Sequence, residues 1–222
     1  MVGFSCDNIP NPCKRRVCRP SPSPTTMAAV PRPTSQASKL EGIIAALHVP
    51  RDRFIRRQRR VDQYVSTMLD EHLLLYITRN KNDNIVCYAP KGTNDAGTPM
   101  SMDVFWQDLA TVAGDGMPDA ELPRTALNFL ERSQAYGVKV IADGDTTLVQ
   151  FVAMPSRSFV LVPTNDKGTP ACLKGMVDGR FVTVTRMHVD EEGGVVIPTV
   201  HGVLLQGVDL ATGTHYMEYM KR

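Results

Sequence analysis

A chain of 222 residues, 42% of them hydrophobic, is long enough to bury a core of its own, which excludes a small scaffold held together by disulfides. Its net charge of +2 is unevenly distributed: residues 1–60 hold twelve Lys and Arg against three acids, a net +9, and residues 61–222 hold thirteen against twenty, a net −7. The basic segment predicts a contact with something anionic: nucleic acid, an anionic membrane, an acidic protein or the acidic part of the same chain.

The first 38 residues are rich in Arg, Pro and Ser and contain one acid, Asp7, which is the composition of a disordered tail. The same composition is found in organellar transit segments, so a mitochondrial or other organellar location stays open as an alternative. Met27 follows this leader abruptly and is a second candidate start. The five cysteines form no C-x-x-C pair, and no apolar run approaches the roughly 18 residues that span a bilayer. We therefore expect a reduced, cytoplasmic protein without a transmembrane segment.

Two helical patterns follow the tail, and together they predict a helical, Arg-rich arm over residues 39–71. Ser38 and Glu41 are placed as a capping box for the first helix, and Pro50 is expected to end it. The second helix is predicted from about Arg51 to Asp70, because apolar residues recur there at helical spacing. The two apolar stripes consist of Leu40, Ile43, Ile44 and Leu47, and of Val61, Tyr64, Val65, Met68 and Leu69.

From residue 72 to residue 222 the pattern is that of β-strands. Turns such as Asp143-Gly144 and Asp178-Gly179 supply the positive φ of tight hairpins, and the short connections favour antiparallel neighbours. One helix is predicted from about Pro123 to Tyr136. The expected fold is mainly β, or α+β: an antiparallel β-sandwich or barrel with one lid helix. Strands are expected near 73–79, 84–89, 103–107, 138–142, 146–154, 158–163, 170–177, 180–189, 195–206 and 214–220.

Four segments, taken in order, carry a resemblance to a known family. They are Tyr76 to Tyr88, Val104-Phe105-Trp106, Ala135 to Val138, and Gly207 to Gly213. Together they resemble an uncharacterised family of small bacterial and protist domains, the domain of unknown function numbered four-eight-three-three. The resemblance covers about Leu73 to Met220 and implies a compact β-rich domain, but it implies no reaction, cofactor or catalytic residue. The Arg-rich segment before residue 73 is an addition to the family pattern.

The hairpin around Asn80 to Asn84 suggests one ligand site. Basic side chains would hold an anionic group by charge-assisted hydrogen bonds, Asn84 would orient it, and aromatic rings would form the walls. If the protein were an enzyme, Lys81 or Tyr88 would serve as its acid or base. The alternative is that the aromatic residues belong to the core and the asparagines only form the turn. The site residues of this hypothesis are Arg79, Lys81, Asn84, Tyr88, Trp106 and Tyr136.

A run of arginines gives a second contact surface. Six guanidinium groups within ten residues would neutralise several phosphates of an RNA, but only Phe54 is interleaved as a stacking platform. We therefore rank an acidic protein partner first, docking on the acidic part of the chain second, RNA third and a membrane fourth. The residues of this basic patch are Arg51, Arg53, Arg56, Arg57, Arg59 and Arg60.

Other chemistry finds little support in the sequence. No G-x-S-x-G, G-x-x-x-x-G-K-[ST] or G-x-G-x-x-G motif occurs, and no cofactor or metal is predicted. His188, His201 and His215 fall in the last three strands, but spacing alone does not make them a zinc site. The acids at 190–192 are expected to be solvated turn residues. The sequence thus predicts a non-catalytic binding or scaffold module that contacts a protein partner, and it leaves the oligomeric state open.

Overall fold

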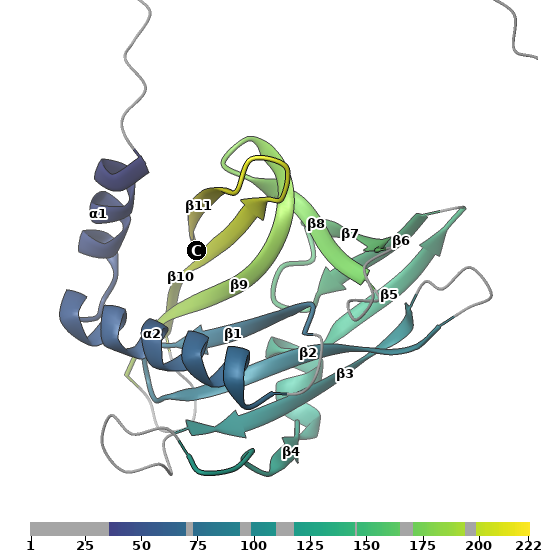
Figure 1. Ribbon diagram of the computed structural model, residues 1–222, viewed down its shortest axis with the longest axis horizontal. Coiled ribbons are helices and arrows are strands. Elements are labelled where there is room, and N and C mark those ends of the chain that lie inside the picture. Colours follow the sequence, from purple (N-terminus) through teal and green to yellow (C-terminus); the bar gives the residue numbers. More distant parts are fainter. Residues whose placement is uncertain are drawn as a thin grey trace, which may run out of the picture. The chain divides into compact units, whose positions relative to one another are not determined.

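The computed structural model describes residues 36–69, 73–93, 99–109, 118–144, 146–164, 171–193 and 199–222 (Figure 1). Ser35 to Arg222 form one compact unit. The predicted tail, apart from its last three residues, and the candidate start at Met27 lie outside the described residues.

Two helices open the compact unit, as the sequence predicts. They are α1 (Gln36–Ala46) and α2 (Arg51–Thr67). Pro50 does not end α1 but precedes α2, where its fixed φ of −55° suits a helix start and its carbonyl accepts the Phe54 N–H at 3.0 Å. The predicted role of Pro50 as a helix stop is therefore wrong, although both helices are present.

Over the described residues, the sheet contains every strand that the sequence predicts and one more, β4, which makes eleven strands in a single sheet. Its order is β4-β3-β2-β1-β9-β8-β7-β6-β5, with β10 paired to β9 and β11 to β10. The long strand β9 joins the two halves of the sheet, because its first residues pair with β8 and its later residues pair with β1. The strands are β1 (Leu75–Arg79), β2 (Asn84–Thr93), β3 (Pro99–Asp108), β4 (Arg124–Ala126), β5 (Val138–Asp143), β6 (Thr146–Phe151), β7 (Ser158–Pro163), β8 (Ala171–Val177), β9 (Arg180–Glu192), β10 (Thr199–Asp209) and β11 (Thr214–Lys221).

Strand direction departs from the sequence prediction at one place. β1 and β9 run parallel, with Tyr76 opposite Arg186 and Arg79 opposite Val189, whereas the other pairs are antiparallel. Short connections predict only the pairing of consecutive strands. This parallel pair joins strands far apart in the chain, so no connection length could reveal it.

The predicted lid helix is wrong in its first half. Arg124–Ala126 form β4 on the edge of β3, and only Glu131–Ala135 form a short π-helix. Asn128 and Glu131 explain where this helix starts, because the Glu131 N–H donates to Asn128 Oδ1 and the Asn128 N–H to Glu131 Oε2, each at 2.9 Å. This reciprocal capping box fixes the helix start after Asn128.

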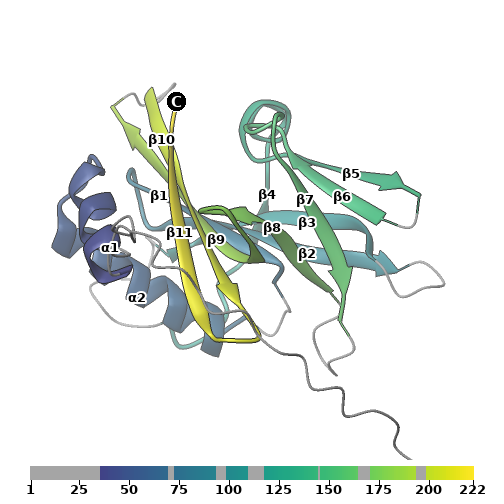
Figure 2. The same ribbon diagram turned by 90° about the horizontal axis from the view of Figure 1, so that it is seen from above.

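The sheet is curled, and its inner face encloses the main core. The ring centroid of Phe151 lies 5.3 Å from that of Tyr88 and 5.4 Å from that of Phe159, and both pairs are in edge-to-face contact. The outer face is covered by the helices: Val61 and Tyr64 of α2 pack on β1, β2 and β3, whereas α1 and the start of α2 pack on β10 and β11. Figure 2 shows both helices next to β10 and β11, with β5, β6 and β7 at the far end of the sheet. The Arg-rich segment thus packs on the sheet as part of the same unit.

Candidate functional site

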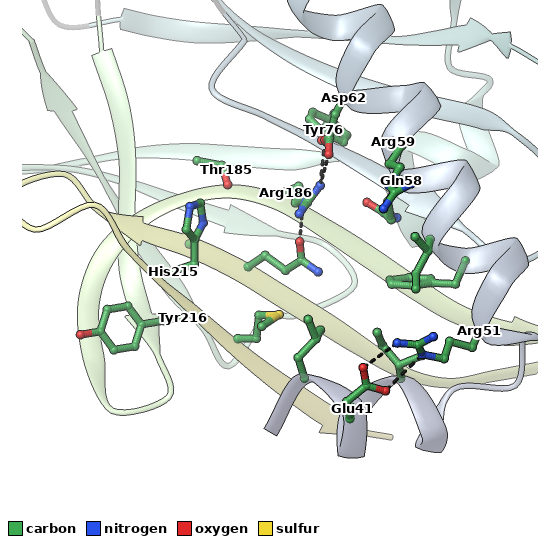
Figure 3. A pocket seen from close by; sticks show the side chains of 17 residues that line it. Glu41, Arg51, Gln58, Arg59, Asp62, Tyr76, Thr185, Arg186, His215 and Tyr216 are labelled. Carbon is green, nitrogen blue, oxygen red and sulfur yellow. Dashed lines mark hydrogen bonds and ion pairs between the residues drawn. The ribbon is translucent and has the colours of Figure 1, made fainter. Parts of the chain in front are cut away.

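An open cavity of about 670 Å³ lies between the two helices and the outer face of β9, β10 and β11 (Figure 3). We call it the helix–sheet groove. Its volume falls in the range of about 300–1,000 Å³ that ligand clefts occupy. Apolar side chains from both helices and from β11 line it: Leu40, Ile44, Phe54, Ile55 and Met217.

A β-bulge shapes the floor of the groove. The register between β9 and β10 jumps from Arg186 opposite Gln206 to Val184 opposite Gly207, which leaves Thr185 as the extra residue. Thr185 and Arg186 consequently both line the groove, although consecutive strand residues normally face opposite sides.

Four polar side chains fix α2 above this floor. Arg186 Nη1 donates to both carboxylate oxygens of Asp62, at 2.7 and 2.8 Å, and its Nε donates to Gln206 Oε1. The Tyr76 hydroxyl donates to Asp62 Oδ1, and burial raises the pKa of Tyr76 well above its ordinary value. The Arg186 charge is therefore balanced inside the protein, and the network holds the groove open in one geometry.

Two members of the predicted basic patch turn inward. Arg57 is buried, donates to Asp83 Oδ1 at 2.5 Å, and donates to the carbonyls of Arg79 and Asn80 at 2.7 and 3.1 Å. Burial lowers the pKa of Arg57 below its ordinary value. Arg60 reaches the Leu109 carbonyl at 3.0 Å. Arg60 Nη1 also donates to Asp83 Oδ2 at 3.4 Å, so both side chains bind the hairpin to α2.

The other arginines of the patch face solvent. Arg51 pairs with Glu41, with 2.6 Å between Nη2 and Oε1. Arg53, Arg56 and Arg59 are exposed, follow one another at i, i+3 spacing on α2, and form no ion pair with the described residues. We call these three the arginine stripe. Arg59 also lines the helix–sheet groove, so the stripe and the groove form one surface (Figure 3).

The predicted hairpin site is partly assembled on the inner face of the sheet. Arg79 ends β1 and Asn84 begins β2. Each stands two residues from a core residue of its own strand, Ile77 or Val86, so both side chains face the inner side of the sheet. The Arg79 guanidinium carbon lies 4.5 Å from the centroid of the Trp106 ring.

The aromatic members of this site pack together. The Trp106 ring is 5.1 Å from that of Tyr136, and its Nε1 donates to Glu131 Oε2 at 3.1 Å. Burial raises the pKa of Tyr136. We call Arg79, Asn84, Trp106, Tyr136 and the neighbouring Glu191 the hairpin cluster.

Lys81 and Tyr88 are the two remaining residues of the predicted site, and each forms one hydrogen bond with a member of the cluster. Lys81 is exposed in the hairpin turn. Tyr88 is fully buried, its hydroxyl donates to the Tyr136 carbonyl at 2.8 Å, and burial raises its pKa well above the ordinary value. The buried Tyr88 hydroxyl does not fit the acid or base role considered for it, because such a group must reach a substrate. The role considered for Lys81 stays a prediction.

The three strand histidines do not converge. His188 is buried between Thr78 Oγ1 at 2.9 Å and Asn80 Oδ1 at 2.7 Å, and burial lowers its pKa to about 3. His201 stacks on His48 with 3.8 Å between ring centroids, whereas His215 lines the groove. Within the described ranges no three metal-ligating side chains are close enough to hold an ion.

The prediction that the acids at 190–192 are solvated is wrong for Asp190 and Glu191, whereas Glu192 is exposed. Asp190 and Glu191 are buried. Asp190 accepts hydrogen bonds from the His48 N–H at 3.0 Å, Asn80 Nδ2 at 2.6 Å and the Tyr219 hydroxyl at 2.6 Å. Burial alone would raise the Asp190 pKa, but these hydrogen bonds lower it below its ordinary value. β9 continues to Glu192, and this extension of the strand carries Asp190 under the helices and Glu191 to the inner face beside Arg79.

The fold and the site define this protein as a curled β-sheet domain with a groove walled by two helices. Residues 75–219 match the family described as Domain of unknown function (DUF4833), and the chain belongs to that family. No curated protein and no solved structure matches the chain. Among the described helices, none is long and apolar enough to cross a membrane.

Proposed function

We propose that this protein is a non-catalytic binding module that holds a segment of a protein partner in the helix–sheet groove. The observation that carries the proposal is the continuity of an apolar cavity of about 670 Å³ with the arginine stripe through Arg59. A segment that combines apolar and acidic side chains matches both parts of this surface.

The charges around the groove support an acidic segment. Both acids that line it are paired within the protein, Glu41 with Arg51 and Asp62 with Arg186. Arg59 adds a positive charge that no acid among the described residues balances. The groove therefore presents a net positive rim, which attracts acids and repels basic segments.

The length of the surface favours a protein segment over a small molecule. From Arg53 to Arg59 the stripe advances six residues along α2, which is about 9 Å at 1.5 Å per residue. A ligand that fills the cavity and also reaches Arg53 must extend along the helix. A peptide segment of several residues does so.

RNA is the less favoured partner for the same surface. Phe54, the aromatic residue within the Arg run, is only 4% exposed and packs edge-on against His188 with 4.9 Å between ring centroids. It cannot serve as a stacking platform for bases, which single-strand binders require. A cytoplasmic location remains part of the proposal, and the buried free thiol of Cys172 supports a reducing compartment.

A peptide selection tests the proposal. The full chain is used to select peptides from a displayed random library, and the expected peptides join apolar residues to Asp or Glu. In the variant Arg56→Glu/Arg59→Glu the dissociation constant should rise about tenfold or more. The matched control Arg132→Glu/Arg180→Glu reverses two exposed arginines away from the groove and should bind as the natural protein does. Selected peptides that bind both variants equally well would contradict the proposal, as would selection of no peptide.

A further inference from the structure

Two buried acceptor atoms without a hydrogen-bond partner lie in the hairpin cluster. They are Glu191 Oε1 and Asn84 Oδ1. The Glu191 side chain is 3% exposed, and its Oε1 stands 3.9 Å from Arg79 Nε, which is too far for a hydrogen bond. Buried acceptors are nearly always satisfied in folded proteins, so two such atoms on the inner face of β2 and β9, the two neighbours of β1, indicate a missing donor.

The Lys81 backbone N–H already donates to the Glu191 carboxyl group, and the other donors around these two atoms have partners elsewhere. Arg79 Nε donates to Asn82 Oδ1 at 2.9 Å, and its guanidinium is held over the Trp106 ring. Trp106 Nε1 donates to Glu131, and the Tyr88 hydroxyl donates to the Tyr136 carbonyl. A ligand that satisfies Glu191 and Asn84 must therefore bring its own N–H or O–H groups.

The charges of the cluster decide which class of ligand fits. An anion would be repelled by the Glu191 carboxyl group and the unpaired Asn84 oxygen, and a cation would be repelled by the Arg79 guanidinium. Each hydroxyl group can donate one hydrogen to an acceptor and can also accept from Arg79, so two hydroxyl groups of one molecule satisfy both Glu191 and Asn84. The Trp106 and Tyr136 rings supply an apolar wall for the C–H faces of such a molecule.

We propose that the hairpin cluster is a binding site for a neutral, polyhydroxylated molecule, a sugar or polyol. The ligand donates to Glu191 Oε1 and Asn84 Oδ1 and accepts from Arg79. Arg79 keeps 18% of its side chain exposed, and the adjoining turn carries the exposed Lys81, so solvent reaches the site from this end of the hairpin. The site lies on the inner face of the sheet, opposite the helix–sheet groove, and is independent of the function proposed there.

Tryptophan fluorescence tests the site directly, because Trp106 is the single tryptophan of the chain. The full chain is titrated with glucose, galactose and mannitol, and with acetate, phosphate and ethylammonium as charged probes. The expected result is a saturable change with at least one neutral polyol and none with the charged probes. Saturation by a charged probe instead, or by no neutral polyol, would overturn the proposal.

Variants separate binding from packing. Glu191→Met removes one unpaired acceptor and Asn84→Ala the other, so each should weaken polyol binding about tenfold or more. Asn84→Ala should not lower the thermal midpoint much, because an acceptor with no partner is not a stabilising contact. Glu191→Met should lower it, because the Glu191 carboxyl group also pairs with Arg79 and accepts from the Lys81 N–H. The control Glu192→Gln changes the neighbouring exposed acid and should leave binding intact. Equal binding by natural protein and both acceptor variants would refute the assignment, as would equal loss in the control.

Discussion

Replacing Arg57 with Ala should destabilise the fold strongly, whereas replacing its neighbour Arg56 should not. Arg57 joins α2 to the hairpin through Asp83 and the carbonyls of Arg79 and Asn80. Removing the side chain leaves the Asn80 carbonyl and the Asp83 carboxylate without this partner. Arg56 is the preceding residue of the same helix, is exposed, and is the matched control.

The size of the effect follows from burial. Breaking a buried ion pair by deleting one partner costs about 3–5 kcal/mol. The Arg57 side chain is 3% exposed but Asp83 is 30% exposed, so water replaces part of the lost interaction. We therefore expect a loss of about 2–4 kcal/mol for Arg57→Ala, and less than about 0.5 kcal/mol for Arg56→Ala.

Urea unfolding of the two variants measures this difference. At about 3 °C per kcal/mol for a chain of this size, the thermal midpoint of Arg57→Ala should also fall by roughly 6–12 °C. A loss below about 1 kcal/mol, or equal losses in the two variants, would refute the reasoning. Arg57 would then belong with the exposed arginines as a surface charge.

Further predictions concern a glycine and a histidine. Gly137→Ala should lower the free energy of unfolding by about 2 kcal/mol or more, because a Cβ there would lie 1.8 Å from the Arg132 carbonyl oxygen. Gly42→Ala, on the open face of α1, should instead raise the free energy of unfolding by about 0.5–1 kcal/mol. The denaturant midpoints of the two variants test both expectations. The pKa of His188 is about 3 in the folded protein, against an ordinary value of 6.5. Between these two pH values the unfolded chain binds a proton that the folded protein does not. The free energy of unfolding should therefore fall as the pH drops from 6.5 towards 3, by at most about 1.4 kcal/mol per pH unit. Urea midpoints at pH 7 and pH 5 should differ less in His188→Gln, and an unchanged difference would contradict a buried neutral imidazole.

The strands were predictable because their turns carry explicit chemistry. Asp178 and Gly179 adopt φ of 53° and 71°, and Gly144 adopts 58°, as tight hairpins require. The parallel contact between β1 and β9 had no such signal, since it depends on how the whole sheet curls. The start of the short helix did have one, the capping box of Asn128 and Glu131, but the helical composition of the preceding residues obscured it.

The arginine run shows why the site was only partly predictable. Phe54, Arg57, Val61 and Tyr64 recur at i, i+3 or i+4 and form the buried face of α2. Helical periodicity therefore predicts that Arg57 is buried and that Arg53 and Arg56 are exposed, whereas composition alone does not distinguish the three. The groove had no sequence signal, because it arises where α1, α2 and a bulged β9 meet across long stretches of chain.

The most direct test of the proposed function is a charge swap between protein and peptide. For a peptide selected by the natural protein, the acid that faces Arg59 is first identified by scanning with Ala and then replaced by Lys. Binding of the Lys peptide to the natural protein should weaken about tenfold or more, and binding to Arg59→Glu should recover most of that loss. A Lys peptide that binds the Arg59→Glu variant no better than it binds the natural protein would contradict an acidic segment seated beside the arginine stripe.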